Sequence, residues 1–584
     1  MSVQRFRREH EKRPVKARVR YSSLILTAVL LVAGCAPGVS SPRADEQSPA
    51  APAIQRALVF VDAGENPDYA TRQLTRASGG LFSSQARDLF NADLVFKDER
   101  GLPHPFLAEA LPELNNASWQ VFPDGKMELT YRLKPNLTWQ DGQPLTAEDF
   151  VFAWRVYSNP VFGVSTSGGL GYVEAVSASD PRTVVFRWKT GYPDALTQVG
   201  LVPPLPQHIL DQPYQQLDPQ QFVGLPFWRQ EYIGLGPWRM IRHEPGVMVE
   251  GEAFDGFVFG RPRIDRVQVI YRPDTRVGIV ALLSGEAHFA MNSYLRDEDG
   301  PVLEESWAQN KGGIVLSEPI APRAMEFQGR PEYAVPTELA SDVRARQGVA
   351  HIIDREALLE VLTNNKGILR DVFAHPKEEY YDVVARAAPS RYRPDPRRAQ
   401  TLLEEAGFAR GADGQWRTPK GERFTLDQWF LASAGNERES TIVVDGLRRF
   451  GIDASSQVWG VQRSSAEERA KISGMFAGSV YLPEEYHTRN IARPENRWSG
   501  TNRYGYSNPQ LDRLLEAWET TLDRSQRIEH IAQVERLVNV DLPSLPMYFR
   551  VRVLGYSSAL AGVVENMTPG AGSERRVWEW YWRA

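Results

Sequence analysis

Short apolar runs and alternating positions characterise the chain between residues 57 and 271. Residues 57–62 (ALVFVD) form a compact apolar run, which predicts a buried strand. Between residues 126 and 134 apolar side chains alternate with polar ones, the pattern of a strand with one buried face. Residues 184–188 and 267–271 predict two further strands.

Helical spacing first appears after Thr146, and it dominates the second half of the chain. Thr146 is placed to cap a helix whose third position is Asp149. Gly407 follows another helical stripe and is expected to end it in a left-handed conformation. Strand character returns at residues 548–554. The mixture predicts an α/β fold with more than one lobe. Similar helix starts, an Asp or Asn before an apolar stripe, occur at Asp342, Asp354, Asp395, Asn508 and Asp523.

The N-terminal segment has the pattern of an export signal. An apolar core at residues 21–33 follows eight basic residues, and it is shorter than the roughly 20 residues that a bilayer helix needs. Val32-Ala33-Gly34-Cys35 resembles a bacterial lipobox, so we expect residues 1–34 to be a signal peptide and Cys35 to carry lipid. The alternative is an uncleaved anchor with an incidental cysteine. Residues 35–56, rich in Pro, Ser and Ala, are expected to form a flexible tether.

Composition narrows the classes of function. Residues 1–34 hold eight Lys/Arg and two Asp/Glu, so the remaining chain carries a net charge of −11 instead of the −5 of the whole. An acidic exported chain is a poor nucleic-acid binder. With one cysteine the chain forms no internal disulfide. No catalytic motif, cofactor loop or metal-ligand spacing is present, so we expect no enzyme, no cofactor and no metal site. A secreted hydrolase is the remaining enzymatic alternative.

Six blocks of sequence, in order, resemble the extracellular solute-binding proteins of peptide/nickel-type ABC importers. Gly234–Trp238 is similar to a Gly-Thr-Gly-Pro turn of that family, with Leu235 in place of the threonine, and Leu282–His288 ends in His288 where the family has aspartate. The other blocks are Pro105–Glu109, Tyr131–Pro135 with Trp139–Phe150, Val343–Arg344 with Ile353–Leu358, and Tyr392 with Leu402–Phe408.

The resemblance implies a two-lobed fold of the periplasmic-binding-protein type (type II class) with a hinge between the lobes and an extra inserted domain. Residues 57–96, 201–315 and 541–584 would form a discontinuous lobe I. Residues 97–200 would form the inserted domain II, and residues 316–540 lobe III. The quoted motifs themselves are interpreted as structural, as turns and helix caps.

The same resemblance implies a receptor, expected to be a tethered monomer, that closes on a small ligand and delivers it to an ABC permease. A peptide is the first expectation, and an oligosaccharide or a metal chelate is an alternative ligand. A sensor or adaptor of the same fold, signalling without transport, is an alternative role.

Candidate ligand contacts lie mainly in one segment of the expected lobe III. Peptide-binding relatives hold the ligand's amino terminus with an acidic residue, within a segment that corresponds here to residues 476–486. Tyr481 or its neighbour occupies the acidic position, so Glu484 or Glu485 is expected to replace it. Tyr481, Tyr486 and Trp498 offer rings for stacking. The alternatives are a solvated acidic pair and core aromatics.

Two other segments contribute candidates by position. Gly79 and Gly80, followed by Phe82, correspond to a stretch that lies along the ligand in relatives, although a surface turn explains the glycines equally well. Arg323 and Phe327 fall on the first strand of the expected lobe III, where Arg323 could bind a carboxylate or simply reach solvent.

Overall fold

A computed structural model describes most of the chain after residue 56, and residues 55–584 form one compact unit. Cys35, Gly79, Gly80, Phe82 and Tyr481 lie outside the described residues, as do the predicted signal peptide and tether. No helix in the described part is long and apolar enough to cross a bilayer. The described residues are 57–72, 74, 85–162, 164, 169–196, 200–291, 294–460, 466–480, 483–496, 498, 500–564 and 576–583.

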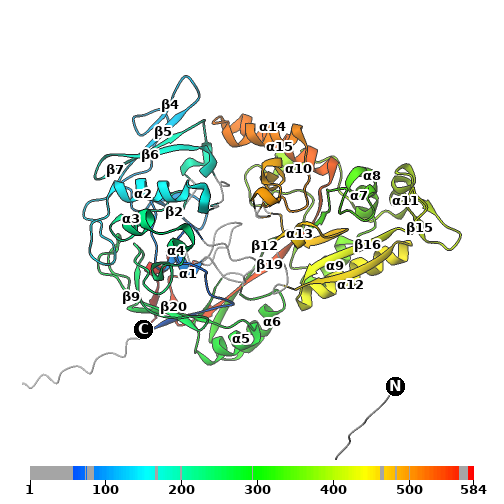
Figure 1. The fold of residues 1–584 in the computed structure, drawn as a ribbon. Helices are drawn as coiled ribbons and strands as arrows, with labels where there is room; N and C mark the ends of the chain where they lie inside the picture. The colour runs from blue at the N-terminus through cyan, green and yellow to red at the C-terminus, as the bar shows by residue number, and fades with distance from the viewer. Residues whose placement is uncertain are drawn as a thin grey trace, which may run out of the picture. The chain divides into compact units, whose positions relative to one another are not determined.

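One eleven-stranded mixed sheet organises the fold (Figure 1). Its strands follow the order β17-β16-β18-β12-β19-β11-β1-β10-β9-β8, and β13 also pairs with β19. The bounds are β1 Leu58–Asp62, β8 Trp238–Glu244, β9 Met248–Ala253, β10 Arg266–Tyr271, β11 Phe289–Ala290, β12 Gly313–Phe327, β13 Ile368–Leu369, β16 Thr425–Leu431, β17 Asp453–Trp459, β18 Met475–Gly478 and β19 Ser544–Ser557. The predicted strands at 57–62, 267–271 and 548–554 are therefore confirmed.

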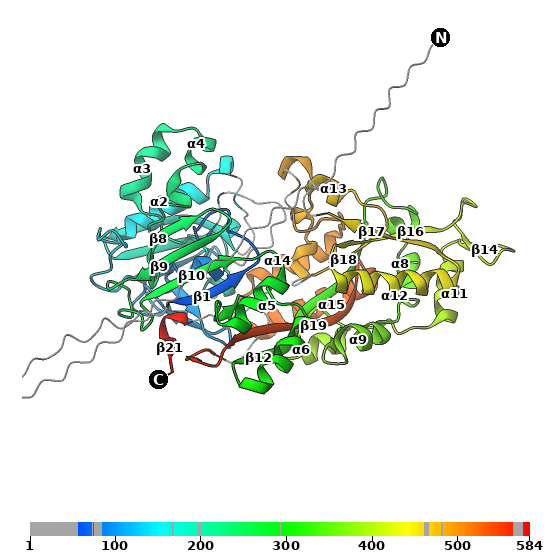
Figure 2. The same ribbon diagram turned by 90° about the horizontal axis from the view of Figure 1, so that it is seen from below.

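Two long antiparallel strands connect the halves of this sheet. β12 and β19 pair from Gly313↔Ser557 to Glu326↔Ser544 and run side by side between β1–β8–β9–β10 and β16–β17–β18 (Figure 2). The expected boundary at residues 315/316 falls inside β12. The chain thus passes from one half to the other along continuous hydrogen-bonded strands, with irregular register at Glu318/Ala321 and at Arg323/Ala324.

A separate four-stranded antiparallel sheet lies in the first third of the chain. It contains β4 (Trp119–Val121), β5 (Met127–Arg132), β7 (Thr183–Trp188) and β6 (Val173–Asp180), in that order. Helix α2 (Ala147–Tyr157) starts after Thr146, whose N–H donates to Asp149 Oδ2 at 2.9 Å. We call residues 119–196 the small-sheet region.

Capping explains where the later helices begin. The carboxylate or amide of Asp342, Asp354, Asp395, Asn508 and Asp523 accepts hydrogen bonds from N–H groups of the first turn, as predicted. Gly407 has φ +87°, the left-handed conformation expected after a helix. The helices are α8 Val343–Ala350, α9 Arg355–Thr363, α11 Pro396–Glu405, α14 Pro509–Thr520 and α15 Arg524–Asp541, and others of ten or more residues are α3 Gln207–Gln216, α5 Thr275–Ser284, α6 Asp299–Asn310 and α12 Ala434–Phe450.

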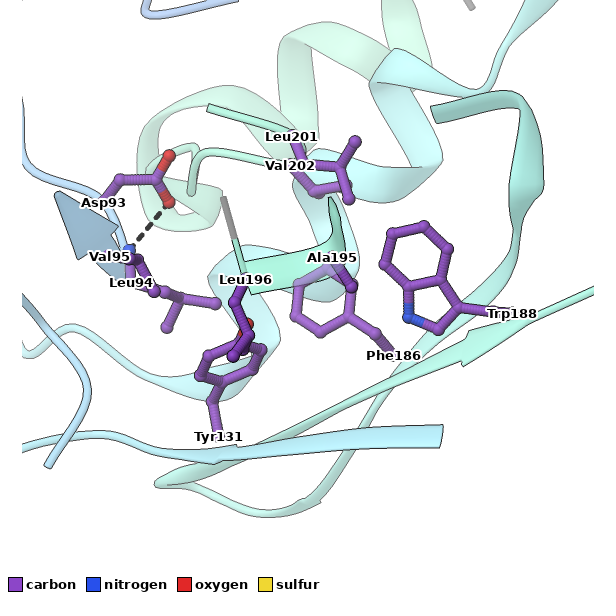
Figure 3. A pocket seen from close by; sticks show the side chains of 10 residues that line it. All are labelled: Asp93, Leu94, Val95, Tyr131, Phe186, Trp188, Ala195, Leu196, Leu201 and Val202. Atoms are coloured by element: carbon purple, nitrogen blue, oxygen red, sulfur yellow. Dashed lines mark hydrogen bonds between the residues drawn. The ribbon is translucent and has the colours of Figure 1, made fainter. Parts of the chain in front are cut away.

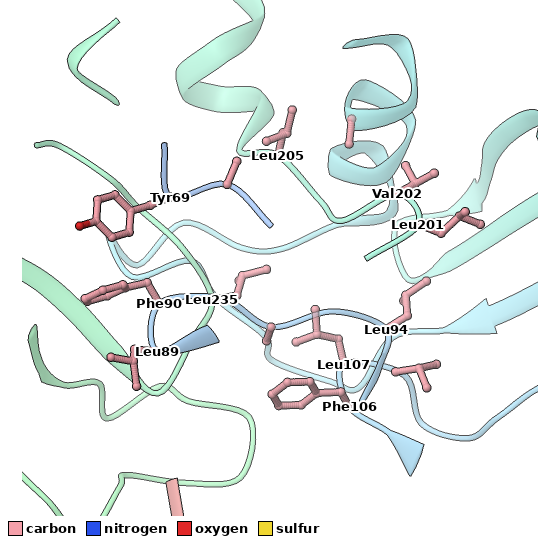
Figure 4. Close-up of a cluster of buried hydrophobic side chains, with 14 of the residues drawn as sticks. Tyr69, Leu89, Phe90, Leu94, Phe106, Leu107, Leu201, Val202, Leu205 and Leu235 are labelled. Carbon is pink, nitrogen blue, oxygen red and sulfur yellow. The ribbon is translucent and has the colours of Figure 1, made fainter. Parts of the chain in front are cut away.

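Two of the motif blocks meet at the largest buried cluster, whose part around Phe90 and Leu235 is shown in Figure 4. Gln140 donates from Nε2 to the carbonyls of Gly236 (3.1 Å) and Trp238 (2.7 Å), and its Oε1 accepts from Gly234 N–H at 3.0 Å. The Gly236 N–H donates to Phe90 O at 2.9 Å. Close approach of backbones requires glycine here, because a Cβ at Gly234 or Gly236 would overlap the Phe90 backbone.

We therefore expect Gly236→Ala to destabilise the protein by about 1–3 kcal/mol, the usual cost of forcing an extra methyl group into a packed interior. The measurement is the unfolding midpoint in urea. Gly446→Ala in α12 is the control, since a Cβ there meets nothing closer than 3.9 Å. Equal midpoints for the two variants would contradict this explanation of the glycine.

Candidate ligand-binding site

The candidate site is built around one short turn, η5 (Pro483–Tyr486), which follows β18. Hydrogen bonds hold this turn at both ends. Asn490 Nδ2 donates to Glu484 O at 2.8 Å, and Asn502 Nδ2 donates to Tyr486 O at 3.0 Å. The buried Tyr486 hydroxyl lies 2.5 Å from Ser544 Oγ on β19. The turn is thus fixed to the long strands, and it carries the two glutamates that the sequence singles out.

Glu484 is partly exposed as a residue, and its carboxylate forms no ion pair with a described residue. Its Oε2 atom is inaccessible to solvent and has no hydrogen-bond partner among the described residues. Burial raises the pKa of Glu484 to about 8, and the negative charges of Glu519, Glu485 and Asp194 act in the same direction. A buried, uncompensated carboxylate is costly for stability, and such groups concentrate at functional sites. At least Oε2 of Glu484 is therefore not solvated, in contrast to the predicted alternative of a solvated acidic pair.

Glu484 lies next to a contact between two parts of the molecule, the small-sheet region and residues 483–541, which we call the helical region. Tyr172 donates its hydroxyl hydrogen to Glu519 on α14, and Arg489 Nη1 donates to the Tyr172 oxygen at 3.1 Å. Arg489 also pairs with Glu519 at 2.5 Å. Asp194 forms an ion pair with Arg527 on α15. The junction therefore consists of five residues that join the two regions through polar groups: Tyr172, Asp194, Arg489, Glu519 and Arg527.

Close packing accompanies these ion pairs. A Cβ added at Gly191 would lie 3.0 Å from Thr520 O, so a glycine lets the small-sheet region approach the end of α14. Burial raises the pKa of Tyr192, whose surroundings include the charges of Asp194, Glu519 and Glu484. Both acids of the junction, Asp194 and Glu519, have arginine partners, whereas the neighbouring Glu484 forms no ion pair with a described residue.

A small cavity is lined by Glu485 and Tyr486 of the η5 turn. It has a volume of about 10 Å³, enough for one water molecule. The structure brings three predicted residues together around it, Phe327, Glu485 and Tyr486, beside the buried carboxylate of Glu326. Burial raises the pKa of Glu326 to about 7; Arg503 opposes this shift and Glu485 adds to it.

The raised pKa of Glu326 predicts a pH dependence of stability. Its ordinary pKa is 4.5, so the folded state binds this proton more tightly than the unfolded state. The contribution to the unfolding free energy is therefore complete below pH 4.5 and is lost as pH rises through about 7, by about 3 kcal/mol at most. We expect Glu326→Gln to reduce the fall in melting temperature between pH 5 and pH 8. Glu495→Gln, an exposed control, should keep the wild-type slope.

A second cavity lies within the largest buried cluster, and it is too small for a ligand of the expected size. Its volume is about 30 Å³, room for roughly two water molecules. Tyr131, Phe186, Trp188 and Asp93 are among its lining residues (Figure 3). Burial raises the pKa of Asp93 to about 6, although the N–H groups of Leu94 and Gly200 donate to it.

Arg323, another predicted site residue, is bound by other groups of the protein. Arg323 is buried, with Nε 3.0 and 2.9 Å from the two carboxylate oxygens of Glu439 and Nη1 3.1 Å from Ala477 O. Although burial opposes it, the Arg323 guanidinium lowers the pKa of Glu439. Arg323 thus neither reaches solvent nor offers a free guanidinium, because Glu439 on α12 binds it. It is not part of the proposed site.

Phe327 is likewise part of a buried core, which also contains Met325 and Tyr548. Trp498 has φ +61° and stands 5.0 Å from the ammonium of Lys471, which lies over its ring. Its described contacts are with Lys471 and Arg493, neither of which is the contact that would join it to Glu484. The sequence interpretation missed Tyr172, Asp194, Glu519 and Glu326, because their importance comes from contacts between distant segments.

No three His, Cys, Asp or Glu side chains in the described ranges are arranged to hold a metal ion.

The fold, with its two lobes joined by β12 and β19, is that of an extracellular solute-binding protein. The family model for bacterial extracellular solute-binding proteins, family 5 (Middle) matches residues 109–478, and the chain belongs to this family. It is a family of binding proteins and not of enzymes, and its members act outside the cytoplasm.

Sequence relatives agree with this assignment. Several putative ABC transporter peptide-binding proteins of Brucella, among them that of Brucella ovis, are 28% identical over 301 residues, which is 50% of this chain and 51% of theirs. The match thus spans about half the length of these curated relatives. The oligopeptide-binding protein AppA of Bacillus subtilis is 24% identical over 92% of this chain and 94% of its own length.

Solved structures share the two-lobed α/β fold. AppA of Bacillus subtilis in complex with a nonapeptide has a TM-score of 0.71 at 19% identity, covering 91% of this chain and 99% of that one. NikZ of Campylobacter jejuni in complex with Ni(L-His) has a TM-score of 0.72 at 20% identity, covering 90% and 99%. The predicted fold class is confirmed.

Proposed function

We propose that this protein is a lipid-anchored receptor that captures a peptide, or another small polar ligand with a positive charge, between its lobes and delivers it to an ABC permease. Family membership and the peptide-bound relative support the receptor role. The observation that supports a positively charged ligand is the Glu484 carboxylate, whose Oε2 atom is inaccessible to solvent and has no hydrogen-bond partner among the described residues. The protein catalyses no reaction in this proposal.

The position of the long strands supports hinge closure as the way the ligand is captured. β12 and β19 connect the halves of the large sheet, and their register shifts provide points of bending. The junction residues meet only when the small-sheet and helical regions are together. A ligand that contacts both regions stabilises that state, and its binding shifts the population towards it.

The lipid anchor is the remaining part of the proposal. Cys35 would carry lipid after removal of residues 1–34, and residues 35–56 would tether the folded part to the cell membrane on its outer side. Mass spectrometry of the mature N-terminal peptide tests this part alone. A diacylglyceryl-modified Cys35 is the expected result.

The test of the receptor role is a thermal-shift screen of the mature protein. We expect pools of tetra- and pentapeptides with free amino termini to raise the melting temperature, since a ligand at 100 times its Kd stabilises by about 2.7 kcal/mol. The matched pools with acetylated amino termini should give a much smaller shift. Oligosaccharides and nickel–histidine complexes complete the screen. A protein that no class of ligand stabilises would contradict the proposed function.

A further inference from the structure

A surface cluster of aromatic rings gathers side chains from residues 96–106, 257–259 and 578. Phe96 and His104, on the hairpin β2 (Val95–Lys97) and β3 (Pro103–Pro105), stack with centroids 5.3 Å apart. Trp578 stands 5.6 Å from Phe96 and 5.7 Å from Phe259. We call Phe96, Leu102, His104, Phe259, Trp578 and Tyr581 the aromatic patch.

The patch is preformed and its outer members are open to solvent. Phe259 is 44% exposed, Tyr581 41%, and Leu102, at the tip of the hairpin, 52%. Beneath them the buried rings of Phe106 and Phe257 support Phe259, the first in a stack with an interplanar angle of 9°. Large exposed apolar side chains that are rigidly supported and contiguous indicate an interaction surface.

Positive charges accompany these rings. The Lys134 ammonium lies 4.4 Å from the centroid of Phe259, and the Arg263 guanidinium 5.0 Å from that of Tyr581. Arg583 is exposed beside Tyr581. None of these three cations forms an ion pair with a described acidic residue. Nearby acids have other partners: Arg261 pairs with both Asp255 and Asp265, Arg576 pairs with Glu579, and Asp98 Oδ2 lies 3.0 Å from His104 Nε2.

The chain also leaves the folded part beside this surface. β1 starts at Leu58, opposite Val267, just after the loop that carries Phe259 and Arg263. The Val59 N–H donates to His288 Nδ1 at 3.0 Å, and the His288 ring lies 4.8 Å from that of Trp582. In Figure 2 the start of β1 and the C-terminal strand β21 (Tyr581–Trp582) lie at the same end of the large sheet.

We propose that the aromatic patch docks onto the anionic lipid surface of the membrane that holds the anchor. Rings with polar edges and long basic side chains favour the headgroup region, where each Lys or Arg contributes about 1 kcal/mol near anionic lipid. The inference rests on the proposed lipid anchor. A flexible tether of residues 35–56 has a root-mean-square span of about 25 Å, so it keeps the patch at high effective concentration near the bilayer. Weak contacts therefore suffice to orient the protein.

The test uses the acylated full-length protein in vesicles of phosphatidylethanolamine and phosphatidylglycerol. Cys35 is the only cysteine and is blocked by lipid, so Leu102→Cys introduces one thiol for a fluorescent label. The matched control is Val361→Cys on α9, which is 53% exposed and belongs to lobe III. Lipids with a nitroxide in the upper acyl chain should quench the label at position 102 several-fold more than the label at position 361.

Combining Phe259→Ser and Tyr581→Ser should remove this difference while the protein stays folded, with a lower melting temperature from the lost packing of Phe259, and keeps its acyl modification. Replacing phosphatidylglycerol by phosphatidylcholine should reduce the quenching at position 102. Equal quenching at both positions in acylated protein would overturn the docking proposal and leave the receptor role intact. Protein whose Cys35 carries no lipid would overturn both the anchor and this inference. Quenching that appears only when a permease is present would assign the patch to that protein instead.

Discussion

Replacement of Glu484 by glutamine is expected to weaken binding of the peptides selected by the thermal-shift screen by at least about 30-fold at pH 8. The substitution preserves the shape of the side chain and removes its charge. Loss of one partner of a buried charge pair costs about 2–5 kcal/mol, and 2 kcal/mol corresponds to about 30-fold. Isothermal titration calorimetry measures the change. Glu495→Gln, in the same segment but exposed, should bind as the wild type does.

The pH dependence separates a charge pair from simple packing. The pKa of Glu484 is about 8 in the unliganded protein, so most molecules carry a neutral carboxylic acid below pH 7. A ligand's ammonium group favours the ionised form, and binding then releases a proton. Affinity should therefore rise by up to tenfold per pH unit between about pH 5.5 and pH 7.5, and Glu484→Gln should abolish this rise. A wild-type affinity independent of pH over this range would sink the proposed pairing.

The elements of this fold could be predicted from the sequence because their determinants are local. Asp395 followed by Pro396 starts α11, and alternating side chains at residues 127–132 form β5. The long pairing of β12 with β19 could not be predicted from such patterns, because it joins segments more than 200 residues apart. Apolar periodicity shows that a strand has a buried face, and it does not identify the partner strand.

The candidate site was predictable only in part, for the same reason. The sequence places two glutamates in the 483–486 turn, and it does not show whether an arginine is available to pair with either of them. The answer depends on segments distant in sequence, because Arg489 pairs with Glu519 and Arg527 pairs with Asp194. Arg323 illustrates the opposite error of inference. An arginine on a strand of lobe III suggests a ligand contact, whereas Glu439 on α12 lies within hydrogen-bonding distance and binds it.

Weakening the junction should shift the protein towards an open form. In Tyr172→Phe the hydroxyl that joins Arg489 and Glu519 to the small-sheet region is lost, while the Arg489–Glu519 pair within the helical region remains. Hydrogen bonds to charged groups contribute about 1.5–3 kcal/mol, so the closed state should lose at least about tenfold in population relative to the open state. Adding Arg527→Gln, which removes the contact with Asp194, should increase the effect.

Small-angle scattering of the double variant should show a larger radius of gyration without ligand, and a return to the wild-type value at saturating peptide. Its affinity should fall about tenfold or more, because part of the binding free energy is then used to close the protein. Arg524→Gln is the matched control, since Arg524 lies on the same helix and pairs with Glu379 on an exposed surface. If the double variant and this control have the same radius and the same affinity, the junction does not stabilise closure. Recognition of the ligand's charge by Glu484 and the contact between the small-sheet and helical regions would then be independent of each other.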